Sequence, residues 1–224
     1  MSNLRDAIVR MALRRPYLYL PVTLVISIVL MEVLVEIAEH TFIKPALQQL
    51  ELQFIAYVQQ FVTPPLTAEV MLVTASGSST FYLLASALVC CWYLYSRQKD
   101  RLYLYLVCLC GGGILNQVLK RIFERVRPDI FPVIAESGYS FPSGHAMGAI
   151  CFYGILAYFA GLGLRSKPLR WGLMAAAGIY ILLIGLSRVY LGVHYPTDIL
   201  AGYAAGATWL FFCITLHRIF RKRY

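Results

Sequence analysis

Long apolar blocks separated by short polar segments run through most of the 224-residue sequence. A helix needs about 20 apolar residues to cross the hydrocarbon core of a bilayer, and the blocks have roughly this length. The pattern predicts an all-α integral membrane protein whose fold is a bundle of six transmembrane helices. The predicted spans are Tyr17–Ile37, Thr80–Tyr95, Leu102–Leu119, Ala146–Leu164, Trp171–Leu186 and Ile199–Leu216.

The second predicted span has two alternative starts. A start at Thr80 makes it short, whereas an extension back through Ala68–Gly77 makes Gly77-Ser78-Ser79 a bend or a helix start. In the third span, Gly111-Gly112-Gly113 is expected to form a close-packing face, because small residues let helix backbones approach each other in a membrane.

The segment from residue 38 to residue 65 is long for a connection between spans. Its apolar residues recur at helical spacing between glutamines, and Pro45 suits the first turn of such a helix. The pattern predicts an amphipathic helix in the first outer loop. That helix either lies at the membrane surface or packs across the end of the bundle.

Composition supports the membrane assignment, since 59% of the residues are hydrophobic and 14% are charged, against roughly 25% charged in soluble domains. The net charge of +9 could indicate nucleic-acid binding, but the basic residues sit in short clusters between apolar blocks. Fourteen of the twenty Lys and Arg fall on one predicted side, which includes a basic tail over residues 1–16. This side, with both termini, is therefore expected to be cytoplasmic. The basic start resembles a signal peptide, but its apolar run is too long, so an uncleaved first span is expected.

No internal repeat or soluble module interrupts this pattern, so residues 1–224 are expected to form a single domain. Neither a nucleic acid nor an obligate protein partner is expected.

Three short polar segments stand at predicted span ends. The first runs from Lys120 to Arg127-Pro128, the second is Pro142-Ser143-Gly144-His145, and the third begins at Ser187-Arg188 and ends with His194 and Asp198. Each one alone fits a structural role: basic residues anchor spans to headgroups, serine and aspartate cap helices, and single histidines are often structural. Nearby acidic residues fit a local salt-bridge pattern, namely Glu124, Asp129 and Glu136.

The span order changes this balance, because it brings all three segments to the same face of the bundle, the side opposite to the basic tails. There Lys120, Arg127 and Arg188 supply three cations for a phosphate group. The amides at Ser143-Gly144 open a helix, where the dipole favours an anion.

The two histidines complete a phosphoryl-transfer scheme. His194 can attack phosphorus if Asp198, four residues later, holds its other ring nitrogen. His145 would protonate the leaving oxygen and then activate water. Catalytic residues are thus expected to be His194, His145 and Asp198. The scheme needs neither a metal nor another cofactor.

These segments resemble the signature of the type-2 phosphatidic acid phosphatase superfamily over the region 120–198. The sequence around them is similar to small bacterial members of the phosphatidylglycerophosphatase B type. The resemblance implies the same roles: His194 as nucleophile, His145 as acid and base, and Asp198 orienting His194. It also implies phosphate binding by five residues: Lys120, Arg127, Ser143, Gly144 and Arg188.

The expected function is hydrolysis of a lipid phosphate at the outer face of a bacterial plasma membrane. The resemblance implies undecaprenyl pyrophosphate as first choice, with phosphatidylglycerophosphate or phosphatidic acid as further substrates. Two alternatives stay open. A lipid phosphotransferase would use the same phosphohistidine, and a transporter would carry ionisable residues deep within its spans.

Overall fold

The computed structural model describes residues 19–130 and 132–220, and this part of the chain contains helices and no strand. The predicted basic tail over residues 1–16 lies outside the described residues. The elements in chain order are α2 (Tyr19–Ile43), α3 (Pro45–Gln59), α4 (Pro64–Ala75), α5 (Ser79–Tyr95), α6 (Lys99–Phe123), α7 (Gly144–Ala149), the π-helix η2 (Ile150–Gly154), α8 (Ile155–Gly163), α9 (Lys167–Tyr190) and α10 (Pro196–Phe220).

Five helices of the described chain are long and apolar enough to cross a membrane, and the count is six if α4 and α5 form one bent span. The five are α2, α6, the continuous α7–η2–α8 unit, α9 and α10. The described part of the chain is therefore all-helical, as the sequence predicts, and five or six of its spans could cross a membrane.

The bend between α4 and α5 measures 50° and lies at the Gly77-Ser78-Ser79 segment. A Cβ atom at Gly77 would lie 2.5 Å from Cγ2 of Ile184 and 3.0 Å from the His145 ring, so the chain passes here too closely for a side chain. Ser78 then caps α5, because its hydroxyl accepts from the amide of Phe81 at 3.1 Å. The segment is thus both a bend and a helix start.

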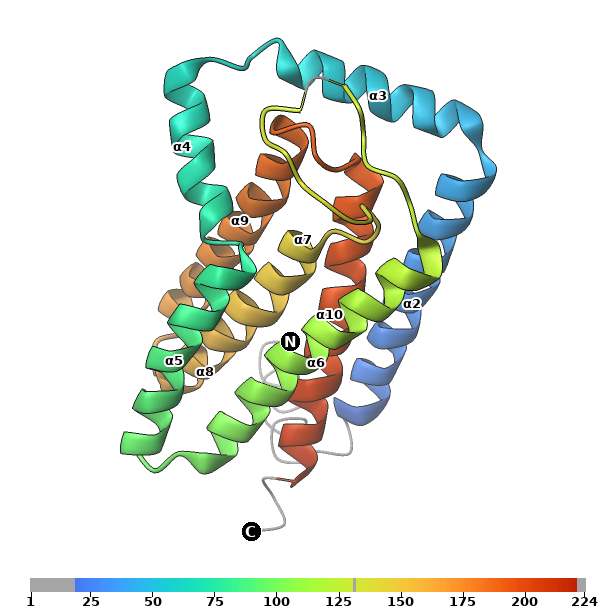
Figure 1. Ribbon diagram of the computed structural model, residues 1–224. Coiled ribbons are helices and arrows are strands. Elements are labelled where there is room, and N and C mark those ends of the chain that lie inside the picture. The colour runs from blue at the N-terminus through green and yellow to red at the C-terminus, as the bar shows by residue number, and fades with distance from the viewer. Residues whose placement is uncertain (1–18, 131, 221–224) are drawn as a thin grey trace.

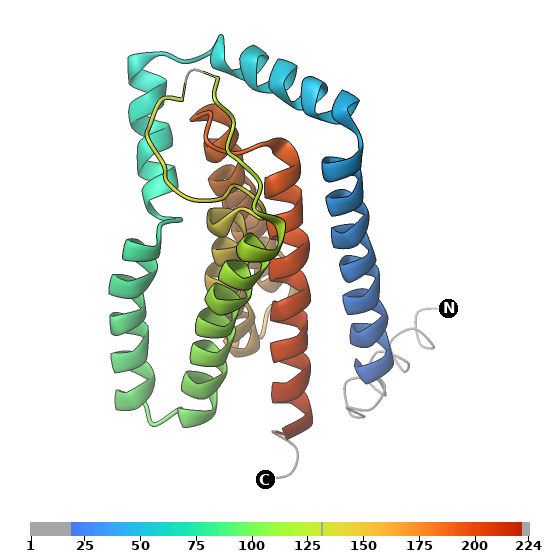
Figure 2. The same ribbon diagram turned by 45° about the vertical axis from the view of Figure 1, so that its right-hand side comes forward.

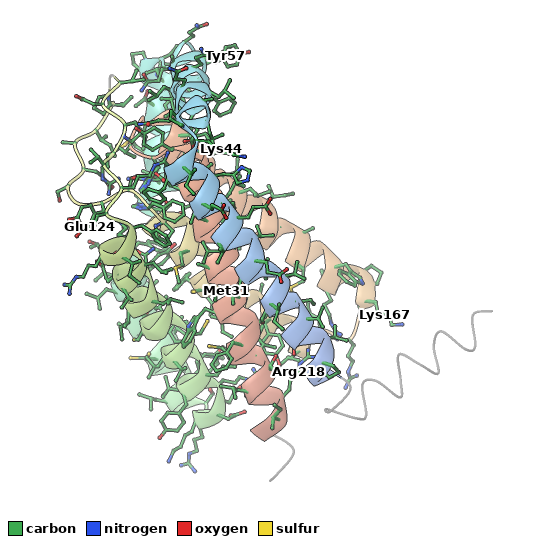
Figure 3. All side chains as sticks on the ribbon, turned by 90° about the vertical axis from the view of Figure 1, so that its right-hand side faces the viewer. Met31, Lys44, Tyr57, Glu124, Lys167 and Arg218 are labelled. Carbon is green, nitrogen blue, oxygen red and sulfur yellow. The ribbon has the colours of Figure 1, made fainter. Side chains whose placement is uncertain are left out.

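One end of the bundle is closed by α3, which crosses from α2 to α4 (Figure 1). We call this end the site end. Figure 3 shows Lys44 and Glu124 at the site end, whereas Lys167 and Arg218 lie at the opposite end. The outer segment over residues 38–65 contains the end of α2, which continues to Ile43, all of α3, which has Pro45 in its first turn, and the start of α4.

The centre of the bundle is occupied by α10, which packs against α2, α6 and α7 (Figure 2). Close packing depends on small residues of α6 where it meets α10 and η2. A Cβ at Gly111 would lie 2.2 Å from the Trp209 ring, and one at Gly112 would lie 2.7 Å from Sγ of Cys151. Nothing lies within 4 Å of a Cβ at Gly113. Two of the three glycines therefore form the predicted packing face.

A loop from Glu124 to Ser143 folds over the site end and carries several charged side chains. It leaves α6 through Glu124, whose φ of 45° is left-handed. The amide of Ser140 donates to the carbonyl of Arg125 at 2.8 Å, and the amide of Val133 donates to the carbonyl of Leu191 at 3.0 Å. The first bond joins the two ends of the loop, and the second ties the loop to the C-cap of α9.

Candidate active site

The turn that starts α7 is held by hydrogen bonds to two other helices. Ser143 is the N-cap, and its hydroxyl accepts from the amide of Ala146 at 3.4 Å. Its own amide donates to the carbonyl of Asp198 at 2.9 Å. The side-chain amide of Asn116 on α6 donates to the carbonyl of Pro142 at 3.2 Å. The turn is thereby fixed to α6 and α10, with Gly144 facing Asn116.

His194 is buried between an acceptor and a donor. Its Nδ1 lies 3.3 Å from Oδ2 of Asp198, and its Nε2 lies 3.1 Å from Nη1 of Arg127. A carboxylate only accepts and a guanidinium only donates, so Nδ1 carries the proton and Nε2 carries the lone pair. The lone pair of His194 therefore points toward the cationic part of the site.

Asp198 also performs the capping role that its position suggested. Its Oδ2 accepts from the amide of Tyr195 at 2.9 Å, just before α10 starts at Pro196. A side chain in the first turn that bonds the preceding amide is half of a capping box. Helix capping and histidine orientation thus use the same carboxylate oxygen.

Arg127 and Arg188 meet at one carboxylate. Nη2 of Arg127 lies 3.0 Å from Oε2 of Glu136, and Nη2 of Arg188 donates to Oε1 of the same side chain. Arg188 also donates from Nη1 to Oγ1 of Thr74 at 2.7 Å, while its buried Nε has no hydrogen-bond partner. The expected salt-bridge pattern is confirmed for Glu136, which lies between two of the predicted phosphate-binding cations.

Lys120 and His145 line a cavity of 690 Å³ together with Arg127, Glu136 and His194. His145 lies close enough to Arg188, Glu136, His194 and Lys120 to interact with each electrostatically. The cavity continues between α5 and α6 along residues from Ser79 to Cys90, roughly 16 Å at 1.5 Å per residue. One end of it is therefore charged and the rest is mostly apolar.

Burial and ion pairs act on the titratable groups of the loops. Burial lowers the pKa of His194, and Arg127 and Arg188 act in the same direction while Asp198 opposes them. For Glu136, burial acts to raise the pKa, but Arg188 and Arg127 outweigh it and the net pKa is lowered. The site at neutral pH therefore combines a neutral His194 with an ionised Glu136.

The structure brings all eight sequence-predicted site residues to the site end: Lys120, Arg127, Ser143, Gly144, His145, Arg188, His194 and Asp198. Three residues near them were not expected to take part: Glu51, Arg125 and Thr197. Within residues 19–130 and 132–220, no three His, Cys, Asp or Glu side chains are grouped so that they could hold a metal ion.

A multi-span helical bundle that gathers paired histidines and several cations at one end has the construction of a membrane enzyme for phosphate chemistry. The sequence profile of the PAP2 superfamily matches residues 101–222, more than half of the chain. The chain belongs to the PAP2 superfamily, and it is an enzyme of the phosphatase class found there.

Relatives of named function agree with this placement. The chain is 40% identical to phosphatidylglycerophosphatase B of Bacillus subtilis (strain 168) over 156 residues, 68% of this chain and 76% of that protein. It is 33% identical to an undecaprenyl-diphosphatase of Sulfolobus acidocaldarius over 111 residues, 48% of each.

A solved structure supports the fold over nearly the whole chain. The crystal structure of a transmembrane PAP2-type phosphatidylglycerolphosphate phosphatase from Bacillus subtilis is similar with a TM-score of 0.79 and 31% identity. The similarity covers 88% of this chain and 96% of that one.

Proposed function

We propose that the chain is a lipid phosphatase that acts through a phosphohistidine on His194 without a metal ion. The observation that carries the proposal is the cavity that joins a cationic, histidine-lined end to an apolar path between α5 and α6. A lipid headgroup would occupy the charged end while its chain follows the apolar part. The chain would then remain within the bilayer.

The first step uses the lone pair on Nε2 of His194. This atom attacks phosphorus, a nitrogen–phosphorus bond forms, and the phosphorus–oxygen bond to the lipid breaks. His145 gives its proton to the departing lipid oxygen. The ring of His194 gains positive charge, which Asp198 stabilises through the Nδ1 hydrogen bond of 3.3 Å.

The second step releases the phosphate. His145, now without its proton, takes one from a water molecule, whose oxygen attacks phosphorus. The nitrogen–phosphorus bond breaks, its electron pair returns to Nε2 of His194, and inorganic phosphate leaves. His145 is again protonated and His194 neutral, so the cycle closes.

Phosphate recognition is assigned to Lys120, Arg127, Arg188, the Gly144 amide and the Ser143 hydroxyl, since the Ser143 amide is already bonded to the Asp198 carbonyl. A guanidinium can bind two phosphate oxygens in parallel, and it remains charged throughout the cycle. The buried Nε of Arg188 lacks a partner in the described structure, which supports an anionic oxygen as its ligand.

The comparison with relatives changes the order in which we propose the candidate substrates. The sequence placed undecaprenyl pyrophosphate first, with phosphatidylglycerophosphate or phosphatidic acid behind it. The similarity to the phosphatidylglycerophosphatase B of Bacillus subtilis covers a larger share of both chains than that to the undecaprenyl-diphosphatase. We therefore propose phosphatidylglycerophosphate first and undecaprenyl pyrophosphate second.

The proposed location is a bacterial plasma membrane, with both termini cytoplasmic and the site end outside. The positive-inside bias of the sequence supports this orientation. Lys167 and Arg218, which belong to the basic clusters, lie at the end opposite to the site (Figure 3).

The test is phosphate release by the purified protein in detergent with EDTA present, from phosphatidylglycerophosphate, undecaprenyl pyrophosphate and phosphatidic acid. We expect release that survives EDTA and is absent from the variant His194→Ala. Release by that variant would overturn the phosphohistidine. Transfer of phosphate to an added lipid alcohol, with no free phosphate formed, would instead identify a phosphotransferase.

A further inference from the structure

Arg125 lies two residues before Arg127 in the loop after α6, yet it faces a different partner set. Its side chain is 8% exposed, and the guanidinium forms an ion pair on each side. Nη1 lies 2.6 Å from Oδ1 of Asp198, and Nη2 lies 2.6 Å from Oε2 of Glu51. The guanidinium also stacks over the ring of Tyr195, 3.8 Å from its centroid.

Glu51 belongs to α3, the helix that crosses the site end, and it is 4% exposed. Its second oxygen, Oε1, accepts from the amide of Thr197 at 2.9 Å and from the Thr197 hydroxyl at 2.6 Å. That hydroxyl oxygen in turn accepts from Nη1 of Arg125 at 2.9 Å. Both carboxylate oxygens of Glu51 are therefore satisfied, as a buried ion pair requires.

The two carboxylate oxygens of Asp198 bind different partners, and this links Arg125 and Glu51 to the proposed reaction at His194. Arg125 binds Oδ1, which leaves Oδ2 for Nδ1 of His194 and for the amide of Tyr195. A carboxylate bound on one oxygen in this way cannot rotate about its terminal bond without losing an ion pair. The orientation of Asp198, and through it that of His194, therefore depends on Arg125.

We propose that Arg125 and Glu51 are positioning residues for the phosphohistidine reaction. The series of contacts Glu51–Arg125–Asp198–His194 connects α3 to the active site. The inference rests on the proposed role of His194. Neither side chain touches the reacting atoms: Arg125 orients Asp198, and Glu51 orients Arg125.

The negative charge of Glu51 has a second proposed effect, on the protonation of His194. Arg125 alone would neutralise Asp198 and weaken its support for a positively charged His194 ring. Glu51 supplies the opposing charge, so that Glu51, Arg125 and Asp198 together keep one net negative charge beside His194. The other charged or titratable groups that act on His194 are Arg127 from the loop, Arg188 on α9 and His145 on α7. Removal of the Glu51 charge should therefore disfavour the charged ring.

The experiment compares Glu51→Gln, Glu51→Asp and the wild type, in the full-length protein with phosphatidylglycerophosphate as substrate. Glu51→Gln removes the charge and leaves one acceptor oxygen in place of two, so that either Arg125 or Thr197 loses its acceptor, while Glu51→Asp keeps the charge. Glu39→Gln is the matched control, because it neutralises an exposed acidic side chain on α2. For each variant, kcat, KM, the pH profile and the fraction of folded protein after heating are measured.

For Glu51→Gln we expect kcat to fall about tenfold, the size typical of losing a partner that orients an active group, with KM within about twofold. The acid limb of the profile should move to lower pH, because a neutral residue at position 51 makes His194 harder to protonate. Glu51→Asp should return the limb to its wild-type position, and Glu39→Gln should leave all quantities unchanged.

A wild-type kcat and an unmoved limb in folded Glu51→Gln would overturn the proposal, as would a loss explained entirely by unfolded protein. If Glu51→Gln does not fold, Arg125→Lys takes its place, since a lysine keeps the charge but cannot bind both carboxylates with a rigid fork. A wild-type kcat there would again overturn it. His194→Ala is assayed in parallel: activity in that variant would refute the proposed function itself, whereas its inactivity makes a negative result count against the positioning chain alone.

Discussion

The guanidinium of Arg127 lies 3.1 Å from Nε2 of His194 and also binds Glu136 through its other terminal nitrogen at 3.0 Å. One side chain thus contacts both the proposed nucleophile and a carboxylate. Because Arg188 binds that carboxylate too, Glu136 occupies the space between the two arginines where a phosphate would be expected. A phosphate bound as proposed would have to displace or loosen Glu136 before phosphorus could approach His194.

This arrangement leads to the first prediction. Glu136→Ala should strengthen inhibition by inorganic phosphate about fivefold, corresponding to ~1 kcal/mol for a partly exposed ion pair. The reason is that both arginines become available without competition. The measurement is the inhibition constant of phosphate during lipid hydrolysis. Glu124→Gln serves as a control in the same loop, and equal or weaker inhibition in Glu136→Ala would show that the carboxylate does not compete with phosphate.

The second prediction concerns pH. Burial lowers the pKa of His194, and this proposed nucleophile must be neutral to react. As the pH falls, activity should therefore persist until the pH reaches this lowered pKa. The acid limb of the pH profile of kcat/KM should then have its midpoint below about 6.5, the ordinary pKa of histidine.

The profile should be recorded between roughly pH 4 and pH 8, the range in which histidine titrates. A phosphate monoester has its own ionisation near pH ~6, but that limb belongs to the substrate and will not move in Glu51→Gln. A limb that moves with the variant and lies above the ordinary histidine value would contradict the prediction.

The helical layout could be predicted because hydropathy reports membrane burial directly, and the common face of the three motifs followed from counting spans. The ends of the helices could not be predicted from hydropathy, because α6 and α9 continue past their apolar blocks into polar segments that still form helical turns. Lys120 and Arg188 stand in those last turns, and this places them inside the bundle end instead of at its rim.

The contribution of α3 to the site could not be predicted from the sequence for a different reason. Glu51 and Arg125 are 74 positions apart, and periodicity marks Glu51 only as a polar position on an amphipathic helix. The structure turns this residue inward together with Ile55. A buried ion pair between distant segments leaves no local pattern, so only the packing of the whole bundle identifies it.

The third prediction tests the apolar path. Gly113 lines the cavity, and a Cβ added there would have nothing within 4 Å, so Gly113→Leu should fold normally while it narrows the space between α5 and α6. We expect KM for a long-chain lipid phosphate to rise about tenfold, since roughly 1.4 kcal/mol of favourable burial would be lost. Activity on a short-chain analogue should change little.

Gly178→Leu provides the control for this test, because Gly178 on α9 is equally open but does not line the cavity. Equal effects of the two variants, or equal effects of Gly113→Leu on long and short chains, would argue against the route between α5 and α6.

The last prediction concerns the contact that fixes the Ser143 turn to α10. A Cβ at Gly202 would lie 2.7 Å from the carbonyl oxygen of Ser143 and 3.0 Å from Cβ of Ala146. Backbone cannot move aside as a flexible side chain can, so Gly202→Ala must displace α10 from the turn. The hydrogen bond of 2.9 Å from the Ser143 amide to the Asp198 carbonyl would be stretched by the same displacement.

We expect Gly202→Ala to lower the free energy of unfolding by about 1–3 kcal/mol, the usual cost of overpacking, and to lower kcat in the protein that remains folded. Gly172→Ala is the matched control, since nothing lies within 4 Å of a Cβ there. Thermal unfolding in detergent and kcat per folded molecule separate the two effects. Normal stability together with normal kcat would mean that α10 and the Ser143 turn can separate without harm, and the site would then not depend on this contact.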